Sequence, residues 1–529
     1  MQGNTLNADR QFDTRFDEKF FIGMNDRLPS HELPTGVFSL LDNVLIADNK
    51  IVKRSGNTGS TAIAGSQNIL GASAFERSNG SKSIIICLNG ASNAQLYEST
   101  NGTTFSAIGS ANLTKDAQMN FVVASDKIFG FNGTDVVDYD GATVTKNRAT
   151  LPLGKFGFWF HNYLFVAGVS GNPNRLYWSD LGTPTTFTNT NFIDINANDG
   201  DSITGLNAFA NQDSDHLLVF KNNSLWTITG FSGSSFNTAT IAGQNTGSLN
   251  YGFGTPSHRS ILSVGKNVYY VSFVGGIPHI RMLERSLYGA LLDAGIVSYE
   301  IEGTMKGLNL SQLSKVAGIY DGKYCYWALP NGSSTTNTIV IQLWHDKLYQ
   351  TAQGPMRSWV KHTSGFTVDT FFLSTISGRT KLYWSDALTS GKVFLVDSSV
   401  YTDNGTAIVS EIRSRDFLGD SVRKTKWKQT FVKYDTGSAG TLAVNARIDQ
   451  ATTFGNQRNI SLAGSSPGLG SFILGTSMLG GSMTTKTPVT LQQLTGTLLG
   501  LQFKESTSNG LTMYDFQVLG NRKGLRTNG

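Results

Sequence analysis

One hairpin pattern recurs along most of the chain and limits the folds that are open to it. A strand of β-branched and aromatic residues is followed by a turn rich in Gly and Asn and by a second strand of the same kind. The copies begin 35 to 56 residues apart and cover residues 83–99, 127–141, 162–180, 216–230, 267–283, 323–344 and 371–386. Four-stranded propeller blades recur at about 40–50 residues, and each needs neighbours to bury its faces. The repeat therefore predicts an all-β fold whose centre, residues 67–400, is a β-propeller of about seven blades.

The two ends of the chain differ from this centre. With 529 residues the chain exceeds the roughly 250–300 residues over which one core grows, so more than one domain is expected. From residue 401 onward the strands become longer and alternate regularly, which predicts a β-sandwich-like domain at 401–529. The N-terminal arm and hairpin, residues 1–66, are expected to complete this domain and to supply assembly contacts. Within it, the Gly-rich tract 462–482 either orders against a neighbouring subunit or is disordered.

One short segment breaks the β pattern. Residues Arg285–Ile296 place Leu287, Ala290, Leu291 and Ala294 at helical spacing. We expect a helix there, inserted between two strands of the propeller.

A five-residue motif occurs twice. Leu176–Asp180 and Leu382–Asp386 both read LYWSD, 206 residues apart, which corresponds to four or five blades. Alternate side chains of a strand share one face, and an Asp after a strand can accept hydrogen bonds in the next turn. We therefore interpret the motif as blade packing, with a ligand contact as the alternative, and its residues are Tyr177, Trp178, Asp180, Tyr383, Trp384 and Asp386.

The charge of the chain is nearly balanced, with 43 basic and 38 acidic residues and a net charge of +5. The densest basic cluster surrounds Trp427 and consists of Arg423, Lys424, Lys426 and Lys428. It is interpreted as the solvated face of a strand, or alternatively as a rim that faces DNA or a protein partner.

The sequence offers little that indicates catalysis, a cofactor or a metal. A GxSxG match places Ser466 in the Gly-rich tract, where no helical period follows, although a nucleophile elbow requires a strand-to-helix turn. The acidic loop Asp194–Asp201 resembles a cation site but lacks the Gly and Glu of an EF-hand, so a turn bonded by its own side chains is expected, with bound Ca²⁺ as the alternative. We expect no enzyme activity, no cofactor and no metal site. Two carboxylates on distant loops could still form a glycosidase or lyase site.

Three further features bear on the cellular context. Cys87 and Cys325 lie in separate apolar strands and are expected to be buried free thiols. No apolar stretch approaches the ~20 residues of a membrane span, and the polar N-terminus predicts no signal peptide. Folding in a cytoplasm is the expectation that follows.

Three stretches resemble one known family, the tail nozzle and hub proteins of short-tailed bacteriophages, which include packaged-DNA stabilisation proteins. The first joins Leu33–Gly36 (LPTG), Leu41–Val44 (LDNV) and Lys50–Gly56 (KIVKRSG), where Ser55 replaces the family's usual Pro. The second joins Arg175–Asp180, Phe192, Gly200–Leu206 and Leu218–Gly230, and the third is Tyr401–Ile408.

The resemblance implies a virion structural protein of the tail, assembled in the host bacterial cytoplasm. Several copies, six in the family, would form a homo-oligomeric ring below the portal and adaptor proteins, retain packaged DNA and conduct it during ejection. DNA would pass without base readout, and the mild net charge agrees with weak contact. The alternatives are a propeller interaction module similar to cell-surface YWTD propellers, a carbohydrate-binding or receptor-contacting tail-tip protein, and a polysaccharide-degrading virion protein.

Overall fold

The computed structural model describes residues 12–523, apart from 64–66, 198, 210–215, 229–240, 243–252, 286–290, 389, 436, 464–483 and 493. The chain divides into two compact units. The propeller unit contains residues 58–341 and 366–396, and the sandwich unit contains residues 1–57, 342–365 and 397–529. Almost all regular structure is β, with short helical turns between strands.

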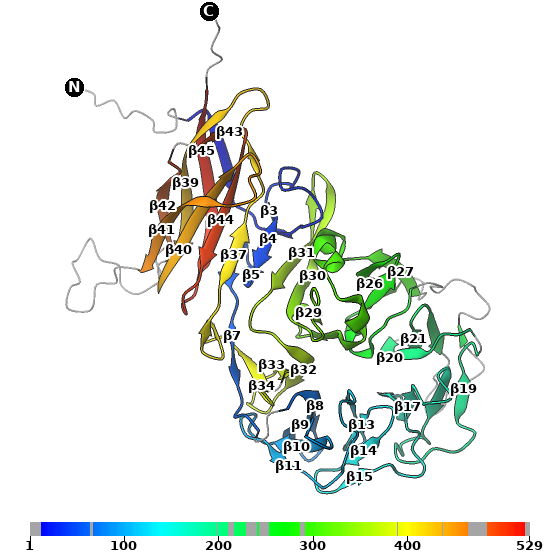
Figure 1. Cartoon of the computed structure of the whole chain (residues 1–529). Helices are drawn as coiled ribbons and strands as arrows, with labels where there is room; N and C mark the ends of the chain where they lie inside the picture. The colour runs from blue at the N-terminus through cyan, green and yellow to red at the C-terminus, as the bar shows by residue number, and fades with distance from the viewer. Residues whose placement is uncertain are drawn as a thin grey trace, which may run out of the picture. The chain divides into compact units, whose positions relative to one another are not determined.

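The propeller unit has seven blades within the described residues, and their innermost strands contact one another in a closed ring (Figure 1). These inner strands are β8, β12, β16, β20, β24, β28 and β32. The first blade contains β8 (Ile69–Glu76), β9 (Lys82–Leu88), β10 (Gln95–Ser99) and β11 (Ser106–Ala107); the second contains β12 (Asn120–Ala124), β13 (Lys127–Phe131), β14 (Val136–Tyr139) and β15 (Val144–Lys146); and the third contains β16 (Phe156–Phe160), β17 (Tyr163–Ala167), β18 (Arg175–Trp178) and β19 (Phe192–Asp194). The fourth blade contains β20 (Ile203–Phe209), β21 (His216–Lys221), β22 (Leu225–Ile228) and β23 (Ile241–Ala242), and the fifth contains β24 (Leu262–Val264), β25 (Asn267–Val274), β26 (Ile277–Arg285) and β27 (Leu291–Ile296). The sixth blade contains β28 (Ala317–Tyr320), β29 (Tyr324–Leu329) and the start of β30 (Ile339–Thr351), and the seventh contains β32 (Val368–Ser374), β33 (Lys381–Asp386), β34 (Val393–Asp397) and β7 (Gly56–Gly59).

Each hairpin that was recognised in the sequence lies in a different blade, so the expected all-β propeller is confirmed. The hairpins are the second and third strands of the first six blades and the first two strands of the seventh. Short helical turns occur between the later blades, at η2 (His258–Ser260), η3 (Tyr299–Ile301), α1 (Glu302–Lys306) and η4 (Leu310–Lys315).

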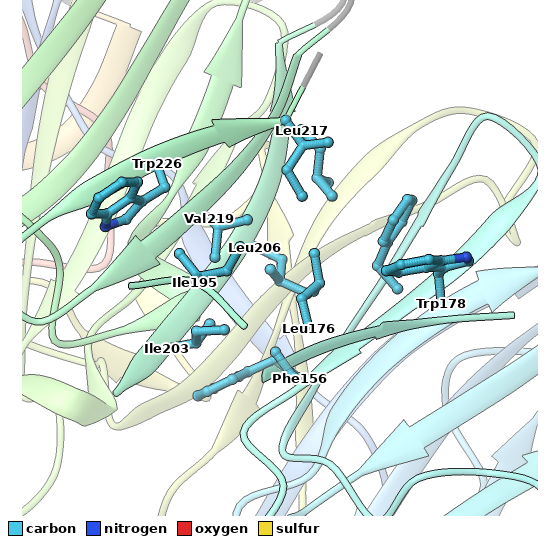
Figure 2. Packing of buried hydrophobic residues seen from close by; sticks show 12 residues of the cluster. Phe156, Leu176, Trp178, Ile195, Ile203, Leu206, Leu217, Val219 and Trp226 are labelled. Atoms are coloured by element: carbon cyan, nitrogen blue, oxygen red, sulfur yellow. The ribbon is translucent and has the colours of Figure 1, made fainter. Parts of the chain in front are cut away.

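Neighbouring blades bury a continuous apolar layer between their faces. Between the third and fourth blades, Trp178 and Leu176 of β18 pack with Leu217 and Val219 of β21 and with Trp226 of β22 (Figure 2). Trp178 is 8% exposed and Trp226 is 2% exposed. Burying a large apolar side chain contributes roughly 1.5–3 kcal/mol, so this layer, repeated between blades, holds the ring together.

The ring is closed by a strand from the N-terminal side of the chain. β7 pairs with β34, so the outer strand of the seventh blade comes from a segment that precedes the first blade. The Ser60 N–H donates to the Val393 carbonyl at 2.7 Å, and the Val393 N–H donates to Ser60 Oγ at 3.0 Å. This pairing of distant segments prevents the first and last blades from separating.

The expected helix at Arg285–Ile296 is wrong. Residues Leu291–Ile296 form β27, which pairs with β26, with Ile296 opposite Arg281 and Leu291 opposite Arg285. Cross-strand pairing at the outside of the fifth blade prevails over the local helical spacing. Residues 286–290 lie outside the described part of the chain.

The unit boundaries differ from the expected domains in two respects. The propeller unit starts at Thr58, and residues 342–365, which lie inside the expected propeller, belong to the sandwich unit. The reason is β30, a strand of 13 residues that leaves the sixth blade, after which β31 (Gly354–His362) pairs with β4 (Leu40–Asp42) in the sandwich unit. No break in hydrophobic pattern marks this change, because both halves of the excursion are regular strand.

The sandwich unit combines the N-terminal and C-terminal segments in two sheets, as expected for the additional β domain. One sheet has the order β42 (Thr484–Thr490), β39 (Thr425–Asp435), β45 (Thr512–Arg522), β6 (Lys50–Lys53) and β5 (Val44–Ala47), with β1 (Thr14–Glu18) beside β45 and β43 (Thr495–Gly496) beside β39. The other has the order β31, β4, β37 (Ser410–Arg413), β44 (Leu498–Glu505), β40 (Gly437–Ile448) and β41 (Gly455–Ala463), with β38 (Phe417–Leu418) beside β44. The short pairs are β2 (Gly23–Met24) with β3 (Val37–Phe38) and β35 (Thr402–Asp403) with β36 (Thr406–Ala407).

Aromatic side chains fill the space between the two sheets. Phe516 of β45 lies 5.0 Å, between ring centroids, from Phe503 of β44 and 6.1 Å from Phe417 of β38. All three rings are fully buried. Among the described residues, no helix has the length and apolar character needed to cross a membrane.

Candidate functional site

An arginine crosses the centre of the propeller. Arg259 lies in η2, before the inner strand of the fifth blade, and its guanidinium reaches the inner strands of the first, second and seventh blades. It donates to the carbonyls of Leu70 at 3.0 Å and Met119 at 2.6 Å, to Asn120 Oδ1 at 3.0 Å, and to Asp369 Oδ2 at 3.0 Å. One side chain therefore ties four of the seven blades together across the axis.

The backbone at Gly71 makes room for this contact. A Cβ atom there would lie 2.1 Å from the Met119 carbonyl oxygen and 3.2 Å from a guanidinium nitrogen of Arg259. Only glycine leaves space for β8 and the start of β12 to approach the arginine together. Sequence inspection missed Arg259 because it lies between blades and carries no motif.

A polar pocket of about 470 Å³ in the propeller unit is lined by Leu70 and Asp369, two of the residues that Arg259 binds. Asp369, Asp116, Gln118, Lys155 and Asn337 are among its lining residues. Burial raises the pKa of the Asp369 carboxyl, and the charge and hydrogen bond of Arg259 oppose this shift. A second pocket of about 410 Å³ is lined by Arg259 itself and by residues of the inner strands.

Both carboxylates of the first pocket are held by protein groups. Asp369 is bound by Arg259, and Asp116 Oδ1 accepts a hydrogen bond of 2.6 Å from Asn89 Nδ2. Within the described part of the chain, no group of three or more His, Cys, Asp or Glu side chains is placed to bind a metal ion. The pocket offers hydrogen-bond acceptors and the ammonium group of Lys155 to a ligand. Its two carboxylates already bind Arg259 and Asn89 and so join parts of the fold.

The two LYWSD copies occupy different positions in their blades. Trp178 lies on β18, the third strand of the third blade, whereas Trp384 lies on β33, the second strand of the seventh. The copies are four blades apart, within the expected four or five, but the motif is not a blade repeat in register. Trp384 is 1% exposed and stacks on Phe394 with ring centroids 4.2 Å apart.

The aspartates of the motif hold the turns that follow them. Asp386 accepts a backbone hydrogen bond of 3.1 Å from Leu388, as expected, whereas Asp180 accepts side-chain hydrogen bonds of 2.8 Å from Thr188 and Asn191. Tyr177 is half-buried beside Phe192, and Tyr383 is buried against Phe372. These contacts support packing over a ligand role.

The acidic loop at 194–201 also has structural partners. Asp194 pairs with Arg175 at 2.7 Å, and Asp199 pairs with Lys221, whose side chain is fully buried, at 2.6 Å. Asp201 accepts the backbone N–H groups of Asn222 and Asn223. Asp199 Oδ1 also accepts the backbone N–H of Asp201 at 3.0 Å, as expected for a turn bonded by its own side chains, and the loop in addition anchors the strand pair β21–β22.

Residues quoted for the family resemblance converge in the sandwich unit. Arg54 from the first stretch forms a buried bidentate pair with Asp403 from the third, at 2.5 and 2.9 Å. Arg54 Nε donates to Asn43 Oδ1 at 3.0 Å, and Asn57 Nδ2 donates to Asp403 Oδ1 at 2.8 Å. In the second stretch, the contacts of Asp201 described above join its two halves. The motif residues thus act as ties between distant segments.

The basic cluster lies at the start of β39. Arg423 and Lys424 are exposed in the preceding turn, Lys426 and Lys428 are half-buried, and Trp427 is fully buried. The cluster therefore occupies an exposed turn and the outer face of β39, as the first interpretation expects. Ser466 and most of the Gly-rich tract lie outside the described residues.

The outer face of the same sheet carries lysines that sequence inspection did not group. Lys50 of β6 and Lys433 of β39 lie 5.2 and 5.7 Å from the ring centre of Tyr514 on β45. Lys486 of β42 lies 5.2 Å from the ring centre of Phe431. The alternation of β39 was visible in the sequence, but the neighbours across strands were not, because they come from separate segments: Lys486 lies 53 residues from Lys433, and Lys50 lies 464 residues from Tyr514.

Comparison with known proteins yields no family. No family model and no curated protein matches the chain. Among solved structures, the Dos1 propeller is 9% identical, with a TM-score of 0.38, over 65% of this chain and 94% of its own. An exo-β-1,3-galactanase from Phanerochaete chrysosporium is 10% identical, with a TM-score of 0.28, over 88% of this chain and 100% of its own. The extracellular domain of a one-component system from B. thetaiotaomicron is 10% identical, with a TM-score of 0.36, over 74% of this chain and 43% of its own. Likeness at this level carries no argument about activity.

Proposed function

We propose that this protein is a structural subunit of a bacteriophage tail, a nozzle or hub protein without enzymatic activity. In this proposal several copies form a ring below the portal and adaptor, which retains packaged DNA and conducts it during ejection. The propeller serves as a rigid body, and the sandwich unit supplies contacts between subunits.

The observation that carries the proposal is the use made of the motif residues. One buried hydrogen-bond network in the sandwich unit joins Arg54, Asp403 and Asn43, which belong to stretches resembling the tail family. In the propeller unit, Asp201 accepts hydrogen bonds from Asn222 and Asn223 of the second stretch. A family resemblance carried by such ties concerns architecture. It favours a protein that is selected for shape and rigidity.

The axis of the propeller supports the same interpretation. Arg259 is bound by groups of the inner strands and joins four blades. Propellers expose few free strand edges, which suits a component that bears mechanical load. In this proposal DNA passes between subunits rather than through the propeller.

Electron microscopy tests the proposal directly. Negative-stain images of the purified protein, alone and with its portal and adaptor proteins, are expected to show closed rings, and labelled antibodies are expected to mark the tail axis of virions. Monomers under all conditions together with no label on virions would contradict it.

The polysaccharide-degrading alternative retains one specific observation, the presence of Asp116 and Asp369 in one pocket. Incubation with host capsular polysaccharide is expected to give no release of reducing ends. Cleavage that is lost in Asp116→Asn and Asp369→Asn, but kept in Asp194→Asn outside the pocket, would replace the structural proposal by the enzymatic one.

A further inference from the structure

A transverse row of lysines crosses the outer face of the sheet β42–β39–β45–β6. Lys433 lies directly opposite Lys486 in the antiparallel register of β39 and β42. Tyr514 of β45 follows Met513, which is paired with Ile51, so that it lies beside Lys50 of β6. Because strands are about 4.8 Å apart, the row Lys486, Lys433, Tyr514 and Lys50 spans about 14 Å.

The burial pattern shows that this row faces solvent within the sandwich unit. Trp427, Thr430 and Val432 of β39 are fully buried on the inner face, whereas Lys433 is half-buried on the outer face and Lys486 is exposed. Lys426 and Lys428 continue the outer face along β39. We call these five side chains the lysine face: Lys50, Lys426, Lys428, Lys433 and Lys486.

The direct pairing of Lys433 with Lys486 lowers the stability of the sheet when no partner is bound. Like charges directly opposite across two strands destabilise a sheet. On the same strands and face, Asp435 and Asp515 supply two negative charges, so the lysines remain in excess. An arrangement that costs stability and concentrates charge is suited to an anionic partner.

Two aromatic rings lie among the ammonium groups. Tyr514 has a lysine Nζ within 6 Å on two sides, and Phe431 has Lys486 above it. Rings and ammonium groups at this spacing match a sugar–phosphate backbone, where cations bind phosphates and apolar rings contact the sugars or exposed bases. A polymer of acidic residues would use the cations but leave the rings without a partner.

We propose that the lysine face binds the backbone of nucleic acid without sequence readout. This inference rests on the proposed function in that DNA is the nucleic acid a tail subunit meets, and it extends the basic cluster at Arg423–Lys428 to a surface three strands wider. Weak, salt-dependent contact is what a conduit requires, because tight binding would hold the DNA in place.

The test measures binding of fluorescein-labelled 30-nucleotide DNA, single-stranded or duplex, to the full chain between 50 and 200 mM KCl by anisotropy. Five phosphate contacts predict a slope of log K against log[salt] of about −4.5 for duplex, a loss of affinity of about 500-fold over this range. In the variant Lys50→Gln/Lys433→Gln/Lys486→Gln, two contacts remain, and the slope falls to about −1.8, a loss of about 12-fold.

A matched control removes the same charge elsewhere. Lys115→Gln/Lys266→Gln/Lys306→Gln changes three exposed lysines of the propeller unit and is expected to leave the slope unchanged. Equal slopes for the two triple variants would overturn the inference, and so would binding to heparin with no binding to either DNA. Duplexes of different sequence are expected to bind alike, and a strong preference for one sequence would overturn the absence of readout.

Ring images of the same preparations separate this inference from the proposed function. A lysine-face variant that still forms rings and loses DNA binding supports both. Rings with an unchanged salt slope leave the tail proposal standing and refute the lysine face. DNA binding through the lysine face in a protein that forms no rings supports the lysine face and refutes the tail proposal.

Discussion

The arginine at the propeller axis provides the most stringent test of the fold, through the variant Arg259→Met. Methionine fills a similar volume but donates no hydrogen bond. The change removes the bonds to Leu70, Met119 and Asn120 and leaves Asp369 without its cation. Breaking one side of a buried ion pair costs about 3–5 kcal/mol, most of it from the charge left behind. We expect a loss of that size in the free energy of unfolding.

The partner variant Asp369→Asn identifies the cause. If the stranded carboxylate is responsible, Arg259→Met combined with Asp369→Asn is less unstable than the sum of the single changes, with a coupling of about 2–3 kcal/mol. The cost of Arg259→Met is also expected to shrink as the pH falls. Burial raises the pKa of Asp369 in the folded chain above its unfolded value, so protonation below that pKa relieves the penalty, which is greatest at neutral and higher pH.

Equilibrium unfolding in guanidinium chloride, followed by tryptophan fluorescence at pH 5 and pH 8, measures all four proteins of this cycle. Gly71→Ala is a second way to disturb the contacts of Arg259, because the added Cβ would clash with the Met119 carbonyl that Arg259 binds. Single changes that add within 0.5 kcal/mol, with a cost for Arg259→Met that does not depend on pH, would show that the axial arginine is not a structural tie.

Three further outcomes are expected. Trp384→Ala should cost about 3–5 kcal/mol in the free energy of unfolding, because it removes a fully buried ring stacked on Phe394, and a cost below 1 kcal/mol would contradict the packing role of the motif. His258 is held neutral in the fold by burial, which lowers its pKa to about 4, so the unfolded chain binds more protons below pH 6.5 and stability falls by up to about 3 kcal/mol between pH 6.5 and pH 4. His258→Gln should flatten this part of the stability profile, measured by urea unfolding, and an unchanged profile would refute the assignment. Lys486→Glu should raise stability by up to about 1 kcal/mol, because it replaces a like-charge pair with Lys433 by an opposite pair, and a measured loss would contradict the like-charge strain.

The repeat of aromatic hairpins was sufficient to predict the propeller, because each blade carries its own local pattern of strand, turn and strand. Cys87 and Cys325, expected to be buried thiols outside any disulfide, are both buried, and no disulfide joins them. The acidic loop at Asp194–Asp201 could be predicted for the same reason as the hairpins, since Asp and Asn side chains bond to backbone groups nearby.

The sequence could not indicate which distant residues meet. Leu291–Ile296 is part of a segment with helical spacing and still forms a strand, because it pairs along its length with β26. Residues 342–365 lie inside the range expected for the propeller, yet they belong to the sandwich unit, in which Lys361 pairs with Asp42, far away in sequence.

The sequence by itself determined that the chain is all-β, repetitive and closed by neighbouring blades, because these properties follow from the period and the turn chemistry of each segment. Only the tertiary structure decided that Arg259 spans the axis, that Arg54 meets Asp403, and that Lys50, Lys433 and Lys486 share one face. The physical reason is that strand pairing and sheet packing join residues hundreds of positions apart, and no local preference records which partner a strand will find.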